Sequence, residues 1–183
     1  IHEKPVWQSI PEESKSFFNE DLPLESSDAD DVYVQFKTHI LPYNKGNIHP
    51  RFWAWVQGTG TPMGVLADFL ASSMNPNVTI GEQSAMYVDL QVIHWCKQML
   101  NYPETASGML LSGASMANTT ALIVARNHMI AFARKQGLQS LALKPVAYCS
   151  TETHSCITKA AEIIGIGTEG LRKIPVNNDY TID

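Results

Sequence analysis

The stretch Gly108-Met-Leu-Leu-Ser-Gly-Ala-Ser-Met-Ala-Asn118 decides the fold, because three kinds of local structure follow one another around it. The apolar run 109–111 predicts a short buried strand. The small residues of 112–115 predict a tight turn, and apolar residues at helical spacing predict a helix that ends near Gly137. We expect Ser115 to be the N-cap of this helix, because its hydroxyl can accept from the free first-turn amides.

The start of this helix is a candidate anion site. Free amides and the positive end of the helix dipole together favour a phosphate group. Gly113 and Ala114 carry almost no side chain, so a ligand can approach the backbone closely. The turn also resembles the Gly-x-Ser-x-Gly turn of hydrolases, with Ser115 as nucleophile and Ala117 in place of the closing glycine. An ordinary strand-to-helix connection is the third interpretation.

The chain beyond this helix alternates strands and helices. Residues 145–150 predict a strand, 153–165 a helix and 171–176 another strand. This alternation predicts an α/β sheet with parallel neighbours and helices on its faces. Ligands of such sheets bind beyond the carboxyl ends of the strands. We therefore expect His154 and the 112–115 turn at one edge of the sheet.

The hydrolase interpretation is the weaker one, because its triad requires the order serine, acid, histidine. After Ser115, the only histidines are His128, which lies within the same helix, and His154. Glu152 is only two residues from His154, too near to come from a separate strand end.

The composition excludes several classes of function. The 183 residues carry a net charge of −5, so no basic surface for nucleic acid is expected. No run of about 18 apolar residues predicts a membrane span. The three cysteines have no regular spacing, which favours a reducing, cytoplasmic compartment. Cys149, His154 and Cys156 lie close in sequence but lack metal-ligand spacing, so no metal site is expected.

The first part of the chain is predicted to be helical. Residues 1–31 are acidic and interrupted by prolines, which is typical of an arm with short helices. Helical spacing and capping residues predict helices over 12–18, 28–41, 62–74 and 84–100.

An aromatic loop, residues 43–62, separates two of these helices. Phe52, Trp53 and Trp55 lie beside His49 between flanking glycines. Aromatic side chains on such a loop favour one wall of a ligand pocket. Packing of the same side chains into a core is the alternative.

Three motifs in this order resemble the group II pyridoxal-phosphate-dependent decarboxylases, which include aromatic-L-amino-acid, histidine and glutamate decarboxylases. The motifs are Gly46-Asn-x-His-Pro-Arg-Phe-Trp53, the 108–118 stretch with Ala125-Arg126, and Tyr148-x-Ser-x-x-x-His-x-x-x-x-Lys-Ala-Ala161. The resemblance runs from about residue 23 onward. It implies an α/β fold: the first half of the large domain of a fold type I PLP-dependent transferase (aspartate aminotransferase type), preceded by a helical N-terminal arm.

The resemblance also implies a domain division and residue roles. Residues 1–75 would form the arm and the substrate-pocket loop, and 76–183 the first part of the cofactor domain. His154 would be the catalytic residue that stacks on the pyridine ring. The remaining implied roles are cofactor binding by Gly113, Ala114, Ser115 and Asn118, and lining of the substrate pocket, in the neighbouring subunit's site, by His49, Trp55, Gln57 and Gly58.

The implied reaction is decarboxylation of an L-amino acid to its amine and carbon dioxide, with pyridoxal 5'-phosphate as cofactor. The tryptophan-rich loop fits an aromatic amino acid. The family also contains members that oxidatively deaminate their substrate, and an inactive relative of the fold is a further alternative.

The partners implied by the resemblance are a second copy, giving a homodimer, and a C-terminal remainder in the same or a separate chain. No lysine of this sequence lies in the family's Schiff-base motif. We therefore expect the 183 residues alone to be inactive, with the remainder supplying that lysine.

Overall fold

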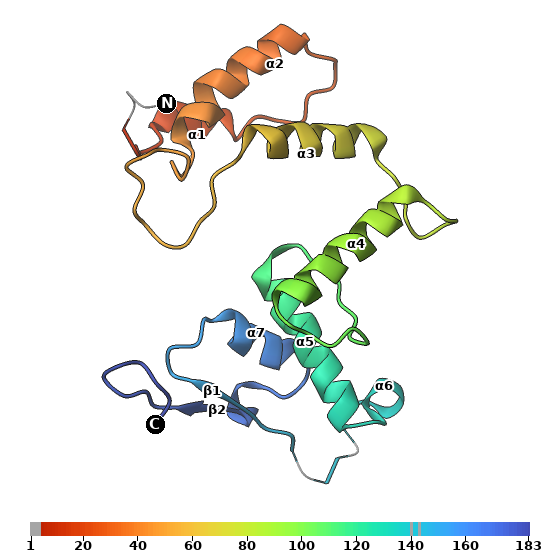
Figure 1. Ribbon diagram of the computed structural model, residues 1–183. Coiled ribbons are helices and arrows are strands. Elements are labelled where there is room, and N and C mark those ends of the chain that lie inside the picture. The colour runs from red at the N-terminus through yellow and green to blue at the C-terminus, as the bar shows by residue number, and fades with distance from the viewer. Residues whose placement is uncertain (1–4, 140, 143) are drawn as a thin grey trace. The chain divides into compact units, whose positions relative to one another are not determined.

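A computed structural model describes residues 5–139, 141–142 and 144–183 (Figure 1). The first four residues of the predicted arm lie outside the described residues. The chain divides into two units, Ile1–Asn77 and Val78–Asp183. Each unit is described by itself below.

Short helices make up much of the first unit. The elements are α1 (Glu12–Phe17), α2 (Ala29–Gln35), a π-helical turn (Phe36–Ile40), a 3-10 turn (Leu41–Tyr43) and α3 (Pro62–Met74). The Asp28 side chain accepts from the amide of Asp30 at 2.8 Å and so caps α2. The predicted start of this helix is confirmed, but its second half is the π-helical turn, not α-helix.

One side-chain pair joins α1 to the π-helical turn. The hydroxyl of Ser14, a buried residue, lies 3.0 Å from Nδ1 of His39. The ring of Phe17 stacks on the same imidazole, with 4.3 Å between centroids and 9° between planes. These contacts hold two segments that are 25 residues apart in the sequence.

Capping residues set the bounds of α3, as the sequence predicts. Thr61 accepts from the amide of Gly64 at 3.1 Å, and Pro62 occupies the first turn. Asn75 ends the helix in the left-handed conformation, with φ of 37°. The apolar side chains of α3, Met63 and Leu70 among them, are more than half exposed. No described segment of this unit therefore covers the apolar face of α3.

The second unit holds a parallel strand pair and four helices among its described residues. They are α4 (Ser84–Met99), α5 (Gly113–Met129), α6 (Ala133–Gln136), β1 (Ala147–Ser150), α7 (Cys156–Ile163) and β2 (Leu171–Ile174), with a 3-10 turn at Thr168–Gly170. β1 and β2 pair in parallel, with Ala147 opposite Leu171 and Ser150 opposite Ile174. The predicted strand-helix-strand unit with a parallel sheet is therefore confirmed.

Two local predictions for this unit are wrong. Residues 109–111 form no strand: Met109 and Leu110 are more than half exposed, and no described segment pairs with them. An apolar run becomes a strand only where a second strand offers a hydrogen-bonding ladder. α5 ends at Met129, well before Gly137, because Ile130 leaves the helical conformation with φ of −123° and ψ of 80°. The short helix α6 follows as a separate element.

The small core of the second unit lies along α7. Ala160 and Ala161 are buried on α7, the helix that packs against α5. Ile164, at the end of α7, is the largest fully buried side chain, with 2% exposed. These three residues are therefore the apolar core that α7 and its C-terminal end supply.

An Ile164→Ala variant is expected to lower the free energy of unfolding by about 2–5 kcal/mol, because it removes buried methylene groups and leaves a cavity. The neighbouring Ile163 is 70% exposed, so Ile163→Ala is a matched control with an expected change below about 0.5 kcal/mol. Urea denaturation of the full-length protein measures both values. Equal losses in the two variants would contradict the assigned core.

Candidate functional site

The helices α5 and α7 run side by side and in the same direction (Figure 1). Near their starts, Nδ2 of Asn118 donates to Sγ of Cys156 at 3.5 Å. Eight residues further along each chain segment, Nη1 of Arg126 donates to the carbonyl of Ile164 at 2.8 Å. The two contacts have the same sequence separation of 38 residues, so the helices are parallel and their N-termini lie at the same end.

The N-terminus of α5 differs in detail from the sequence prediction. The helix begins at Gly113, with Ser112 as the N-cap, so Ser115 is the third residue of the helix and not its cap. Gly113 has φ of 81°, a conformation that suits glycine, and it turns the chain into the helix ahead of Ser115. The predicted capping role of Ser115 is therefore wrong.

The first turn of α5 is open. The Ser112 side chain makes no capping hydrogen bond. Gly113, Ala114 and Ser115 are all exposed, and a Cβ placed on Gly113 would meet no atom within 4 Å. First-turn amides without a capping side chain, at the positive end of a 17-residue helix, are the donors that an anion requires.

His154 lies at the same end, directly before α7. Its side chain is exposed, and Nδ1 accepts from the backbone amide of Cys156, the first residue of α7, at 3.2 Å. The imidazole thus satisfies one of the free amides at this helix start. The structure therefore brings His154 and the 113–115 turn to the N-terminal end of one helix pair.

Asn118 does not point into that turn. It is half-buried, and its amide donates to the thiol of Cys156 on α7. The sequence carries no signal for this role of Cys156, because a contact between side chains 38 residues apart leaves no local pattern. Among the described residues, no group of three or more His, Cys, Asp or Glu side chains could hold a metal ion.

The aromatic loop belongs to the first unit. His49 is 6% exposed, and its Nδ1 accepts from the amide of Arg51 at 3.0 Å. Its Nε2 is buried with no hydrogen-bond partner among the described residues. Nδ2 of Asn47 donates to the carbonyl of Gly58 at 3.0 Å and so ties the two ends of the loop. These contacts order the loop from its base.

Trp55 is an exposed residue of the loop. It has φ of 56°, and Nζ of Lys45 lies 4.4 Å from the centre of its ring. Trp55 lines an apolar pocket of about 650 Å³ together with Trp7 and Phe52. His49 lines a different cavity of about 310 Å³, so the structure does not bring His49 and Trp55 into one pocket.

The remaining predicted pocket residues, Gln57 and Gly58, are exposed. Trp7 was not foreseen as a pocket residue, because an isolated tryptophan in a proline-interrupted arm carries no periodic signal.

Residues 11–183 match the pyridoxal-dependent decarboxylase conserved domain. The chain belongs to the pyridoxal-dependent decarboxylase family. The aromatic-L-amino-acid decarboxylase of Bacillus atrophaeus is 33% identical over 185 residues, which cover 100% of this chain and 37% of the relative. Tryptophan decarboxylase 2 of Oryza sativa subsp. japonica is 26% identical and is matched over 97% of this chain and 37% of its own length.

Solved structures share the fold of this chain. Mouse CSAD superimposes with a TM-score of 0.84 at 20% identity, covering 98% of this chain and 38% of that protein. Oryza sativa TDC with PLP and tryptamine gives a TM-score of 0.82 at 24% identity, covering 98% and 39%. The predicted fold class is confirmed, and the chain spans slightly more than a third of these relatives.

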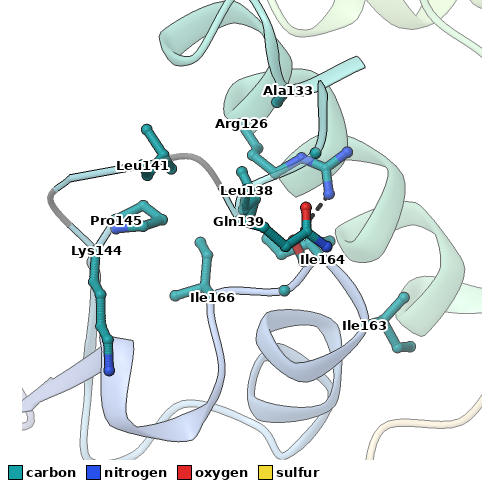
Figure 2. A pocket seen from close by; sticks show the side chains of 12 residues that line it. Arg126, Ala133, Leu138, Gln139, Leu141, Lys144, Pro145, Ile163, Ile164 and Ile166 are labelled. Carbon is teal, nitrogen blue, oxygen red and sulfur yellow. Dashed lines mark hydrogen bonds between the residues drawn. The ribbon is translucent and has the colours of Figure 1, made fainter. Parts of the chain in front are cut away.

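A cavity of about 600 Å³ lies at the opposite end of the same helix pair (Figure 2). Arg126, Leu138 and Lys144 are among its lining residues. The guanidinium of Arg126 is engaged by the carbonyl of Ile164 and by Asn127. Helix C-termini present carbonyl groups and the negative end of the dipole. This cavity therefore does not suit the phosphate group that the sequence analysis expects at a helix N-terminus.

Within the described ranges, no helix combines the length and apolar character needed to cross a bilayer.

Proposed function

We propose that the protein decarboxylates an L-amino acid to its amine and carbon dioxide with pyridoxal phosphate as cofactor. The observation that carries this proposal is the open N-terminus of α5, which lies at the same end of the helix pair as the exposed imidazole of His154. Family membership supplies the cofactor class, and the described residues fit it.

The cofactor phosphate would be held by the first turn of α5. The amides of Ala114 and Ser115 are donors without a capping side chain, and the open space above Gly113 admits an anionic group. Asn118 was also predicted from the sequence to bind the cofactor; that role stays a prediction, because its amide is engaged by Cys156. When bound, pyridoxal phosphate supplies the electron sink for loss of the carboxylate.

His154 would act on the cofactor ring and the substrate. Its Nδ1 is engaged by the helix amide, so Nε2 remains for an outside partner. The flat ring would stack on the cofactor, and Nε2 would orient the substrate carboxylate for loss. The protein thereby contributes orientation, the part of the chemistry that side chains rather than the cofactor perform.

We propose an aromatic amino acid as the substrate. Trp55, Gln57 and Gly58 would line the substrate pocket, and His49 would belong to the same loop. The tryptophan-lined pocket of the first unit supports this choice, since aromatic walls stack on aromatic side chains. A relative at 33% identity that is named an aromatic-L-amino-acid decarboxylase also supports it.

The proposal includes a homodimer, a cytoplasmic location, and a Schiff-base lysine outside these 183 residues. Exposed apolar side chains such as Leu24, Val34 and Leu70 support a partner subunit, because exposed apolar surface of this extent is typical of interaction faces. The division into an arm with the pocket loop, 1–75, and a cofactor domain, 76–183, is part of the same proposal.

The hydrolase alternative lacks a base. Among the described contacts, the Ser115 hydroxyl has no histidine partner, and Nδ1 of His154 is already bonded to Cys156. A serine nucleophile needs a base within hydrogen-bond reach. An inactive relative of the fold remains the second candidate. The experiment below distinguishes it from an active enzyme by the release of carbon dioxide.

The absorbance spectrum of the full-length protein, before and after borohydride, tests the proposed function. We expect a visible imine band that borohydride abolishes, a label on a lysine outside these 183 residues, and carbon dioxide release from an aromatic amino acid. The isolated 183-residue chain is expected to release none. A spectrum without such a band, even after addition of pyridoxal phosphate, would overturn the proposal.

A further inference from the structure

The hydrogen bond between His154 and Cys156 determines which ring nitrogen carries the proton. Nδ1 of His154 lies 3.2 Å from the amide nitrogen of Cys156. A backbone amide can only donate, so Nδ1 must accept. A neutral imidazole has one donor and one acceptor nitrogen, and the proton therefore lies on Nε2. The exposed ring directs a donor, not an acceptor, toward its surroundings.

Cys156 is itself held in place from α5. Its side chain is 6% exposed, and its thiol accepts from the amide of Asn118 at 3.5 Å. The far end of α7 is held by the hydrogen bond from Arg126 to Ile164. With both ends tied to the same helix, α7 cannot rotate about its axis without losing one of these contacts. The direction of the Cys156 amide is therefore set by α5.

We infer that Asn118 and Cys156 are positioning residues that hold His154 in the tautomer with the proton on Nε2. In this role, Asn118 acts through Cys156. The catalytic consequence rests on the proposed function, because only then does Nε2 meet a substrate carboxylate. The tautomer itself does not depend on that function.

Solid-state nitrogen-15 NMR of histidine-labelled, cofactor-free full-length protein near neutral pH measures the tautomer directly. A His154→Asn variant identifies the His154 signals by difference. We expect an unprotonated Nδ1 and a protonated Nε2 in the wild-type protein. A proton on Nδ1 would overturn the inference, whether or not the protein decarboxylates an amino acid.

Substitutions test the positioning role. Asn118→Ala and Cys156→Ala are each expected to give a mixture of tautomers and to lower kcat by about tenfold with little change in KM. Cys156→Ser keeps an acceptor for Asn118 and is expected to retain the wild-type signals. Thr158→Ala, a small truncation at a half-buried position of the same helix, is the matched control and is expected to change neither.

The double variant separates the two possible roles of Asn118. If Asn118 acts through Cys156, the Asn118→Ala/Cys156→Ala protein should be no worse than either single variant, because one interaction is removed twice. Additive losses, or an Asn118→Ala spectrum identical to wild type, would overturn the inference. If the wild-type protein instead shows the expected tautomer signals but releases no carbon dioxide from an amino acid, the result would count against the proposed function alone.

Discussion

A His154→Ala variant of the full-length protein is expected to lose about 10²- to 10³-fold in kcat. The substitution removes both the ring that would stack on the cofactor and the Nε2 proton that would orient the substrate carboxylate. Carbon dioxide release under saturating amino acid measures kcat, and cofactor absorbance shows whether the variant still binds pyridoxal phosphate. Because the phosphate contacts lie on α5, cofactor binding is expected to weaken far less than kcat.

Two further variants control this result. His154→Asn places a carbonyl oxygen where Nδ1 accepts from the Cys156 amide, since asparagine side chains bond the backbone two residues on. It is expected to lose as much kcat as the alanine variant while keeping the start of α7 intact. His128 is exposed on α5 with no described side-chain contact, so His128→Ala is expected to stay within about twofold of wild type. Wild-type kcat in His154→Ala would contradict the catalytic role.

A Ser115→Glu variant is expected to bind pyridoxal phosphate at least about a hundredfold more weakly, a loss of about 3 kcal/mol. The carboxylate would lie at the helix N-terminus that holds the phosphate, and two negative groups there repel. The same substitution is expected to stabilise the cofactor-free protein by about 0.5 kcal/mol. Ser112 is the N-cap and position 115 is the third helical residue, so glutamate there completes a capping box and complements the helix dipole.

The Ser115→Glu variant is informative because it is expected to weaken cofactor binding but to raise the stability of the cofactor-free protein. Cofactor titration by absorbance measures the binding loss, and thermal denaturation of the cofactor-free protein measures the stability gain. Ser115→Gln has the same size and capping ability without the charge, and its binding loss is expected to stay below about tenfold. Equal affinities for the glutamate and glutamine variants would show that the phosphate lies elsewhere.

The sequence predicts best those elements whose signals are local. The bounds of α3 follow from Thr61, Pro62 and Asn75, each of which acts within one helical turn. β1, α7 and β2 follow from hydrophobic period and alternation, and their parallel pairing follows from the short helical crossover. Residues 109–111 carry an equally clear apolar pattern, but a strand also needs a neighbouring backbone, which no local pattern specifies.

In the candidate site, too, local sequence signals predict some features and miss others. The small residues 113–115 and the position of His154 before a helix are visible in the sequence, and the structure has both at one end of the α5–α7 pair. The N-cap was misplaced by three residues because serine occupies both 112 and 115, and only the positive φ of Gly113 decides between them. The Asn118–Cys156 contact joins residues 38 positions apart through side-chain orientation, which periodicity does not report.

The equal spacing of the two ties between α5 and α7 has a consequence for sequence divergence among relatives. Insertions or deletions between Met129 and Ala147 change the length of a connection without disturbing either tie, and longer connections cost little free energy. One residue inserted between Asn118 and Arg126 would rotate the later part of α5 by about 100°. Homologues should therefore vary in length in the connection and keep a constant count of residues inside the helix.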